Sequence, residues 1–214
     1  MDWMVLRMLV KKIQEINKNR VKILLENDFS FVLYKGEVRL YRIKEGESLD
    51  EKAYDEIMSV ILPKRAKLRA MNLLKVRPYT VKGLRDKLSD GGYPELIVNV
   101  AIDYVSSYHY LDDYQYACDF INTYKDRKNK KKLIFDLTQK GVSKDIINEA
   151  IENEWSIDGD DLEEEQIIKF IKKSGVDINS VTYEEKMKLL GKLARKGFSS
   201  SKIKKIIGDL ESFD

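Results

Sequence analysis

The side chains that could do chemistry in this sequence are few among the catalytic types. His109 is the only histidine and Cys118 is the only cysteine. A nucleophilic triad, or a zinc site that uses histidine, would therefore have to rest on His109 alone. A simpler interpretation is that His109 packs or caps a turn before Tyr110. We expect no catalytic residue in the chain.

Acidic pairs could in principle bind metal ions, because two-metal nucleases need several convergent carboxylates. The pairs here are Asp112-Asp113 and Asp160-Asp161, with an acidic run at 163–165. Each pair stands where a helix is expected to begin, and carboxylates favour that position without any metal. The sequence also lacks a Gly-x-x-x-x-Gly-Lys-Ser/Thr loop and a Gly-x-Gly-x-x-Gly motif. We therefore expect no metal and no cofactor.

The cationic side chains are numerous and clustered, although the net charge is only +3. Residues 64–87 hold nine Lys or Arg against one acid, and residues 125–144 hold eight against two. Such blocks suit a polyanion or a charged protein partner, and they also occur on solvated helix faces. Contacts of this kind bind phosphates weakly and without reading base sequence. The candidate contacts are Lys64, Arg65, Lys67, Arg69, Lys75, Arg77, Arg85, Lys128, Lys130, Lys131, Lys132, Arg195 and Lys196.

Tyrosines between positions 104 and 124 offer a second way to hold nucleic acid, because aromatic rings can stack on bases. Their near-helical spacing is more typical of a core and its solvent-exposed edge, which is therefore the favoured interpretation. Stacking on bases is the alternative.

The first 45 or so residues have the alternation of a small β-sheet. Val21, Ile23 and Leu25 alternate in one run and Phe29, Phe31 and Leu33 in the next, with Asn27-Asp28 able to form the turn between them. Residues 11–16 could add a third strand, and residues 37–43 fit either a strand or a helical turn. Ser48 or Asp50 could cap a helix that runs towards Leu62, where Pro63 is expected to interrupt it.

Beyond Pro63 the sequence predicts only helices, and their punctuation repeats. The anchors are Gly92, Gly141 and Gly197, which we expect at positive φ after a helix. Leucines lie eight and four residues before each anchor, and leucines four apart share one helix face. An apolar residue and a helix-starting residue follow each anchor, with a β-branched residue at the sixth position. The matched columns are Leu84, Leu133 and Leu189; Leu88, Leu137 and Leu193; Tyr93, Val142 and Phe198; Pro94, Ser143 and Ser199; Val98, Ile147 and Ile203.

This spacing predicts a mainly α protein: three tandem three-helix repeats behind a small N-terminal β-hairpin or sheet. The predicted parts are a β-containing extension over 1–48, a first repeat with its preceding helix over 49–109, a second repeat over 110–156 and a third over 157–214. No apolar run approaches the roughly 18 residues needed to cross a membrane. That, with a single cysteine, leads us to expect a cytoplasmic protein with no membrane partner; we also expect a monomer.

Several segments resemble the RecX family. Arg77-Pro78-Tyr79-Thr80 followed by Leu84 resembles its first helical repeat. Tyr110-Leu111-Asp112-Asp113 resembles its second-repeat signature, and Lys140-Gly141 followed by Val142 resembles the end of that repeat's middle helix. Gly197-Phe198-Ser199, after Arg195-Lys196, is similar to the third. The resemblance covers roughly residues 60–210. Gly83 replaces a family glutamate that would complete a capping box, so that helix should begin less firmly.

The resemblance implies regulation of the RecA recombinase. RecX proteins bind the RecA–DNA filament and inhibit its ATPase and strand exchange. The role expected of this chain is to inhibit these activities, and the coprotease activity of RecA, in recombination and DNA repair. It implies RecA as the protein partner, with weak, non-specific DNA binding. The alternative is a stand-alone, sequence-independent DNA-binding repeat protein, since helix–turn–helix spacing recurs in each repeat. A small nuclease is a third and weaker alternative.

Overall fold

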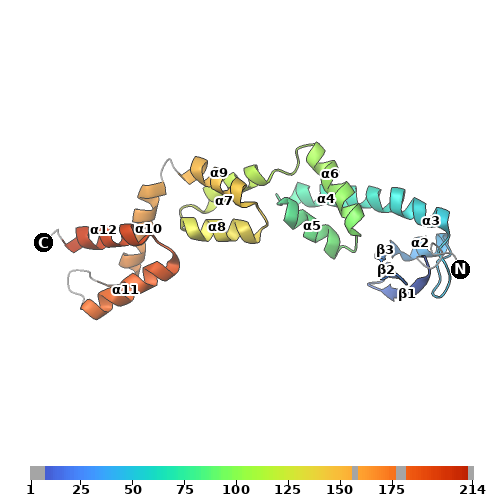
Figure 1. The fold of residues 1–214 in the computed structure, drawn as a ribbon, viewed down its shortest axis with the longest axis horizontal. Helices are drawn as coiled ribbons and strands as arrows, with labels where there is room; N and C mark the ends of the chain where they lie inside the picture. The colour runs from blue at the N-terminus through green and yellow to red at the C-terminus, as the bar shows by residue number, and fades with distance from the viewer. Residues whose placement is uncertain (1–7, 156–158, 177–181, 212–214) are drawn as a thin grey trace. The chain divides into compact units, whose positions relative to one another are not determined.

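The computed structural model describes residues 8–155, 159–176 and 182–211. The chain divides into two compact halves, Met1–Asp112 and Asp113–Asp214. The N-terminal half holds the only strands of the described residues, followed by helices (Figure 1). The C-terminal half is helical in all its described elements.

The sheet has three antiparallel strands in the order β1 (Val10–Glu15), β2 (Arg20–Leu25) and β3 (Ser30–Tyr34). In its register Ile23 lies opposite Ile13 on one side and Phe31 on the other. The predicted turn is confirmed: Asp28 has φ 60°, and the Asn27 side chain accepts a hydrogen bond from the Phe29 amide at 3.1 Å. Asn27 and Asp28 thus close the hairpin, because asparagine and aspartate tolerate the left-handed backbone conformation and bond the nearby backbone.

The segment that fitted either a strand or a helical turn forms helix α2 (Lys35–Leu40). The Glu37 carboxylate accepts from the amide of Tyr34, the residue before the helix, at 2.8 Å. A glutamate at this position satisfies an amide that the first helical turn leaves without a backbone acceptor. The helix is therefore favoured over a fourth strand.

The prediction that Pro63 interrupts the helix running towards Leu62 is wrong. Helix α3 (Glu51–Glu56), which Asp50 caps, continues through a π-helical turn, η1 (Ile57–Ile61), into α4 (Leu62–Val76). Figure 1 shows this run without a break. The amide of Leu62 bonds to the carbonyl of Ile57, five residues back. In a regular α-helix the ring of Pro63 would clash with the carbonyl four residues earlier, and the wider π-helical turn lies at that place. Pro63 itself lies in the first turn of α4, where proline is tolerated.

Helices α5 (Val81–Asp90) and α6 (Glu95–Ser107) complete the N-terminal half. Its sheet and its helices share one hydrophobic core, which contains Val10, Phe31, Leu62, Leu88 and Val105. The apolar face of the sheet is buried against the helices in this core, and that burial stabilises the sheet.

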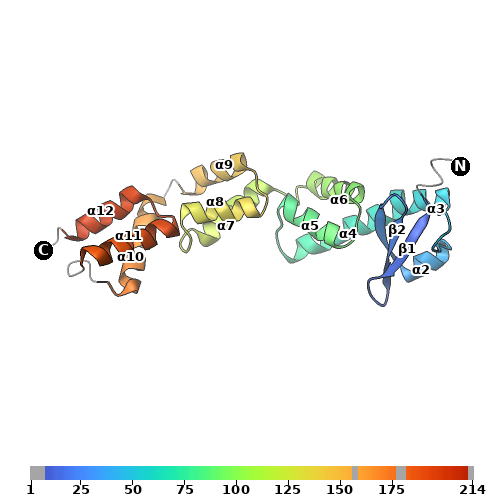
Figure 2. The same ribbon diagram turned by 60° about the horizontal axis from the view of Figure 1, so that its bottom comes forward.

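The C-terminal half has two cores. One belongs to α7 (Asp113–Tyr124), α8 (Lys130–Gln139) and α9 (Lys144–Trp155), and the other to α10 (Gly159–Ser174), α11 (Tyr183–Lys196) and α12 (Ser200–Glu211). Figure 2 shows each set of three grouped together. The fold class is confirmed: from α4 onwards the described residues form nine helices and no strand. The side chains of Asp160 and Asp161 lie outside the described residues.

The glycine anchors end the middle helices as predicted. Gly92, Gly141 and Gly197 have φ values of 86°, 84° and 94°. The amide after each glycine donates to the carbonyl of the leucine four residues before the glycine; these bonds are Tyr93 to Leu88 at 3.4 Å, Val142 to Leu137 at 3.1 Å and Phe198 to Leu193 at 3.3 Å. This is the Schellman arrangement, which satisfies carbonyls at a helix end. All six predicted leucines of the middle helices are buried.

Candidate functional site

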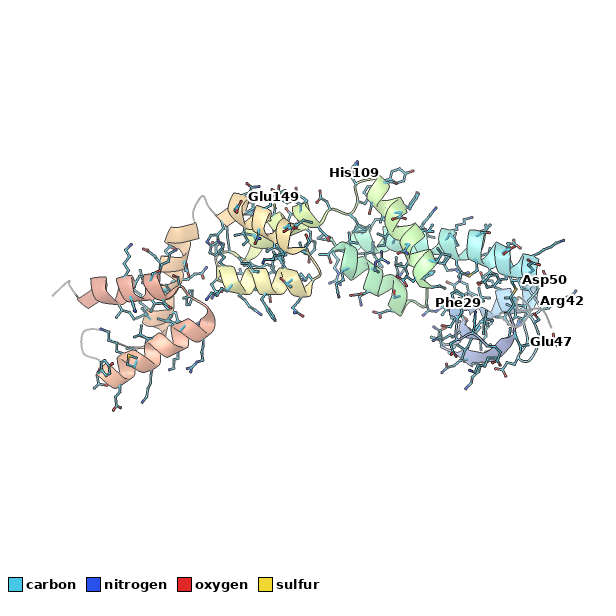
Figure 3. The ribbon with its side chains drawn as sticks, viewed as in Figure 1. Phe29, Arg42, Glu47, Asp50, His109 and Glu149 are labelled. Carbon is cyan, nitrogen blue, oxygen red and sulfur yellow. The ribbon has the colours of Figure 1, made fainter. Side chains whose placement is uncertain are left out.

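His109 and Cys118, the two candidates for nucleophilic or acid–base chemistry, are in different halves of the chain. His109 is exposed with φ 57°, just beyond the end of α6, as its label in Figure 3 indicates. The amides of His109 and Tyr110 donate to the backbone carbonyls of Ser106 and Val105, so His109 caps the C-terminal end of α6. Cys118 lies in the core of α7–α9, where burial raises the pKa of its thiol. Within the described residues no three His, Cys, Asp or Glu side chains form a metal-binding group.

The first cationic cluster lies mainly on α4, and part of it holds the fold together. The Arg65 guanidinium pairs with Glu37, donates to the carbonyl of Val32 at 3.4 Å and covers the ring of Tyr34 at 4.5 Å. It thereby ties α4 to β3 and α2. Arg85 donates to the side chain of Asn99 in the next helix. These two arginines are committed to contacts within the protein.

Other members of this cluster face solvent. Lys64, Arg69 and Lys75 are exposed and form no ion pair among the described residues. Lys67 and Arg77 rest on aromatic rings, over Tyr104 at 4.9 Å and over Tyr79 at 4.7 Å. An ammonium or guanidinium over a ring keeps its charge and can still meet an anion.

The second cluster divides in the same way. The Nζ atoms of Lys128 and Lys132 each lie 2.8 Å from a different oxygen of Asp136. Burial alone would raise the pKa of Asp136, but the hydrogen bonds and charges of the two lysines outweigh it and hold the pKa below its ordinary value. Lys128 also covers the rings of Phe120 and Tyr124. These two lysines therefore fix the start of α8.

The remaining lysines of this cluster lie beside the third cluster, which the sequence places more than 60 residues away. Asn129 caps α8 by accepting from the Lys132 amide at 2.9 Å, and it also donates to the carbonyl of Lys196 at the end of α11. The side chain of Lys131 lies beside Gly197: a Cβ added to Gly197 would be 3.4 Å from it. The second and third repeats thus meet at the start of α8 and the end of α11.

This junction leaves three cations in solvent. Lys130, Lys131 and Arg195 are exposed and have no ion pair in the part of the chain that the structure describes. Lys196 covers the ring of Phe170 at 4.8 Å. Sequence reasoning missed this role of Asn129, because its contact with Lys196 spans 67 residues and leaves no local signal in the sequence.

The tyrosines form two groups. Tyr116 and Phe120 stack on α7 with centroids 6.4 Å apart, and Lys128 and Lys140 cover parts of this ladder. Tyr108 and Tyr110 stack at 6.0 Å and are 56% and 54% exposed. The first group forms the covered edge of a core, whereas the second presents rings to solvent.

The residues that carry the family resemblance lie at helix ends and in cores. Leu111 is buried in the N-terminal half, Asp113 begins α7, and Phe198 is buried in the third core. Lys140 is the C-cap of α8 and covers the ring of Tyr116 at 5.8 Å. Gly141 and Gly197 end their helices at positive φ.

Comparisons with known proteins agree on one family. A family model described as RecX, first three-helix domain, matches residues 66–104. A "Regulatory protein RecX" of Clostridium botulinum (strain Eklund 17B) is 30% identical, over 95% of each chain. One of Clostridioides difficile (strain 630) is 28% identical, over 94% of each.

Two solved structures share the fold. One titled "Crystal structure of regulatory protein RecX" has a TM-score of 0.63 at 24% identity and covers 94% of this chain and 98% of its own. A RecX structure from Lactobacillus salivarius has a TM-score of 0.59 at 23% identity, over 71% and 97%. No helix of the described residues is both long and apolar enough to cross a bilayer.

Proposed function

This chain belongs to the RecX family of regulatory proteins, and on that premise we propose that it binds the active RecA filament and inhibits its ATPase, strand exchange and coprotease activity. The observation that carries the proposal is the match to regulatory relatives along 95% of the chain, at 30% identity.

The modular fold supports a multivalent contact. The second and third repeats have separate cores and are joined at Asn129 and Lys196. If each repeat contacts one filament subunit, joining them raises avidity by roughly 10²–10⁴ without new contacts. Deleting residues 159–214 leaves Trp155 in the second core, so the deletion should weaken inhibition far more than it weakens folding of the rest.

The DNA contribution is weak and sequence-independent in this proposal. Its contacts are the exposed cations that have no ion pair among the described residues: Lys64, Arg69, Lys75, Lys130, Lys131 and Arg195. Cations already paired with Glu37 or Asp136 would first have to break those pairs. Affinity should therefore fall with salt in proportion to the phosphates neutralised.

The test is a DNA-dependent ATPase assay with RecA of the same organism, titrated with the full chain and with Lys130→Glu/Lys131→Glu. Both positions lie in the first turn of α8, where glutamates interact favourably with the helix dipole by about 0.3–1 kcal/mol each. The variant should fold at least as well as the parent while inhibition weakens by about tenfold at low salt, where surface charge counts most. Lys52→Glu/Lys144→Glu makes the same charge change on exposed lysines in the first turns of α3 and α9, and it is the matched control.

The outcomes separate the alternatives. Failure of the folded full chain to inhibit at concentrations stoichiometric with RecA would remove the proposal. Inhibition that disappears when excess DNA is added would indicate a stand-alone DNA-binding protein that competes for DNA. Equal loss in both double variants would show that only net charge matters.

A further inference from the structure

A pocket of about 370 Å³ lies in the N-terminal half, between the sheet and the turn that joins α5 to α6. We call it the sheet–turn pocket. The sheet contributes Ile16, Arg20, Lys22, Ser30 and Val32, and the turn contributes 89–94. Its volume falls within the range typical of binding pockets, about 300–1,000 Å³. The second and third repeats have no strand among their described residues, so this pocket belongs to the first repeat alone.

A close backbone approach forms the pocket. A Cβ on Gly92 would lie 2.2 Å from a methyl carbon of Val32, so only glycine lets β3 pack against this turn. Side chains alternate between the faces of a strand. Arg20 and Lys22 therefore share the face of Val32, opposite the core face that carries Val21 and Ile23. The pocket is thus a feature of the outer face of the sheet.

The pocket is electropositive, with no internal anion for its cations. Neither Arg20 nor Lys22 forms a side-chain hydrogen bond or an ion pair with any described residue. The one acid in the lining, Asp90, lies 3.8 Å from Lys87. Burial raises the pKa of Tyr93 in the pocket wall, and the charges of Arg65, Arg69 and Arg20 oppose that rise. Of these three arginines only Arg65 has a carboxylate partner in the described chain.

We propose that the sheet–turn pocket binds an acidic side chain of a protein partner, whose carboxylate pairs with Arg20 and Lys22. Arginine presents a planar fork of donors that matches a carboxylate. The walls are also apolar, because Ile16, Val32 and Pro94 line the pocket and Ile16 is 48% exposed. A glutamate beside an apolar residue would satisfy both parts of the lining.

Nucleic acid fits this pocket less well. Asp90 lines the pocket and the exposed Glu95 directly follows the lining residue Pro94, so both carboxylates would repel a chain of phosphates passing over this turn. Phosphates also offer no apolar group to Ile16 or Val32. The inference extends the proposed function, because a RecA subunit is the expected partner, but its test needs no RecA and can succeed or fail separately.

The test is a titration of the ¹⁵N-labelled full chain, followed by NMR, with a blocked peptide in which leucine alternates with glutamate. A peptide with glutamine in place of glutamate and a short oligothymidylate are the comparison probes. We expect saturable shifts of the Arg20 side-chain Nε–H and of the Ser30 and Tyr93 amides with the acidic peptide only. Arg20→Gln/Lys22→Gln should weaken binding at least about tenfold, the factor expected from one charge-assisted hydrogen bond.

The control variant is Lys12→Gln/Lys18→Gln, which removes the same charge from exposed positions outside the pocket lining. It should change the affinity by less than about twofold, since exposed pairs contribute little. Three results would overturn the inference: no saturable shift up to about 10 mM peptide, equal weakening in both double variants, or pocket shifts with the oligothymidylate that match those with the peptide.

Discussion

Gly92 offers the sharpest test of how the sheet joins the first repeat. Its φ of 86° is left-handed, and an added Cβ would lie 2.2 Å from Val32 Cγ2 and 3.1 Å from Val32 Cβ. Gly92→Ala therefore adds two costs. The left-handed backbone costs about 1–2 kcal/mol for a residue with a Cβ, and relief of the overlap costs about 1–3 kcal/mol more. The free energy of unfolding should fall by about 2–5 kcal/mol.

Gly46→Ala separates the two costs. Gly46 also has a positive φ, 77°, but a Cβ there would meet no atom within 4 Å. It should lose only the backbone part, about 1–2 kcal/mol. Val32→Ala removes the clashing methyl groups, at a cost of about 1–2 kcal/mol on its own. In the double variant Gly92→Ala/Val32→Ala only the 3.1 Å approach of the two Cβ atoms remains. Its loss should therefore be smaller than the sum of the two single losses by about 1–3 kcal/mol.

The measurement is urea unfolding with hydrogen exchange read at the β2–β3 amides, because the C-terminal half would otherwise contribute its own transition. Equal losses for Gly92→Ala and Gly46→Ala, with additivity between Gly92→Ala and Val32→Ala to within about 0.5 kcal/mol, would refute the close packing of β3 on this turn.

Three further changes test the C-terminal half. Asn129→Ala should cost about 1–3 kcal/mol in urea unfolding, because it loses both the helix cap and the hydrogen bond to the carbonyl of Lys196. Asn129→Ser keeps the cap and should lose only the second part, so an Asn129→Ser variant as stable as the parent would count against the link between repeats. Leu137→Ala should cost about 2–5 kcal/mol, and a circular dichroism melt that barely moves would contradict the repeat packing. Because the folded pKa of Asp136 lies below its ordinary 3.8, its ion pairs stabilise the fold above that pH and the stabilisation is lost as pH falls through the lower folded value. Asp136→Asn should remove this acid-dependent part, and an unchanged pH profile of unfolding would contradict the assignment.

The helical repeats could be predicted from the sequence because their ends are local. The bond from Val142 to Leu137 spans only five residues, and it needs a residue that tolerates positive φ at Gly141. The leucines that precede each glycine are buried for the same reason in all three repeats. Local chemistry of this kind repeats whenever the sequence repeats.

The state of each cation could not be predicted in this way. Arg65 and Lys64 are neighbours in the sequence, yet only Arg65 reaches Glu37, 28 residues away. Asn129 meets Lys196 across 67 residues. The continuous helix through Pro63 likewise depends on the widened turn at Ile57–Ile61. Counting charged and helix-breaking residues along the sequence cannot reveal these long-range or compensating contacts.

The cores differ in how much of the chain each one needs, and this sets an order in which they can form on the ribosome. The core of α7–α9 draws on residues from Ala117 to Trp155 and can close soon after that segment emerges. The first core includes both Val10 and Leu111, so it requires about 100 residues of nascent chain. At roughly 5–20 residues per second, the sheet, although made first, waits several seconds for the helices that cover it. During that interval its apolar face is open to chaperones.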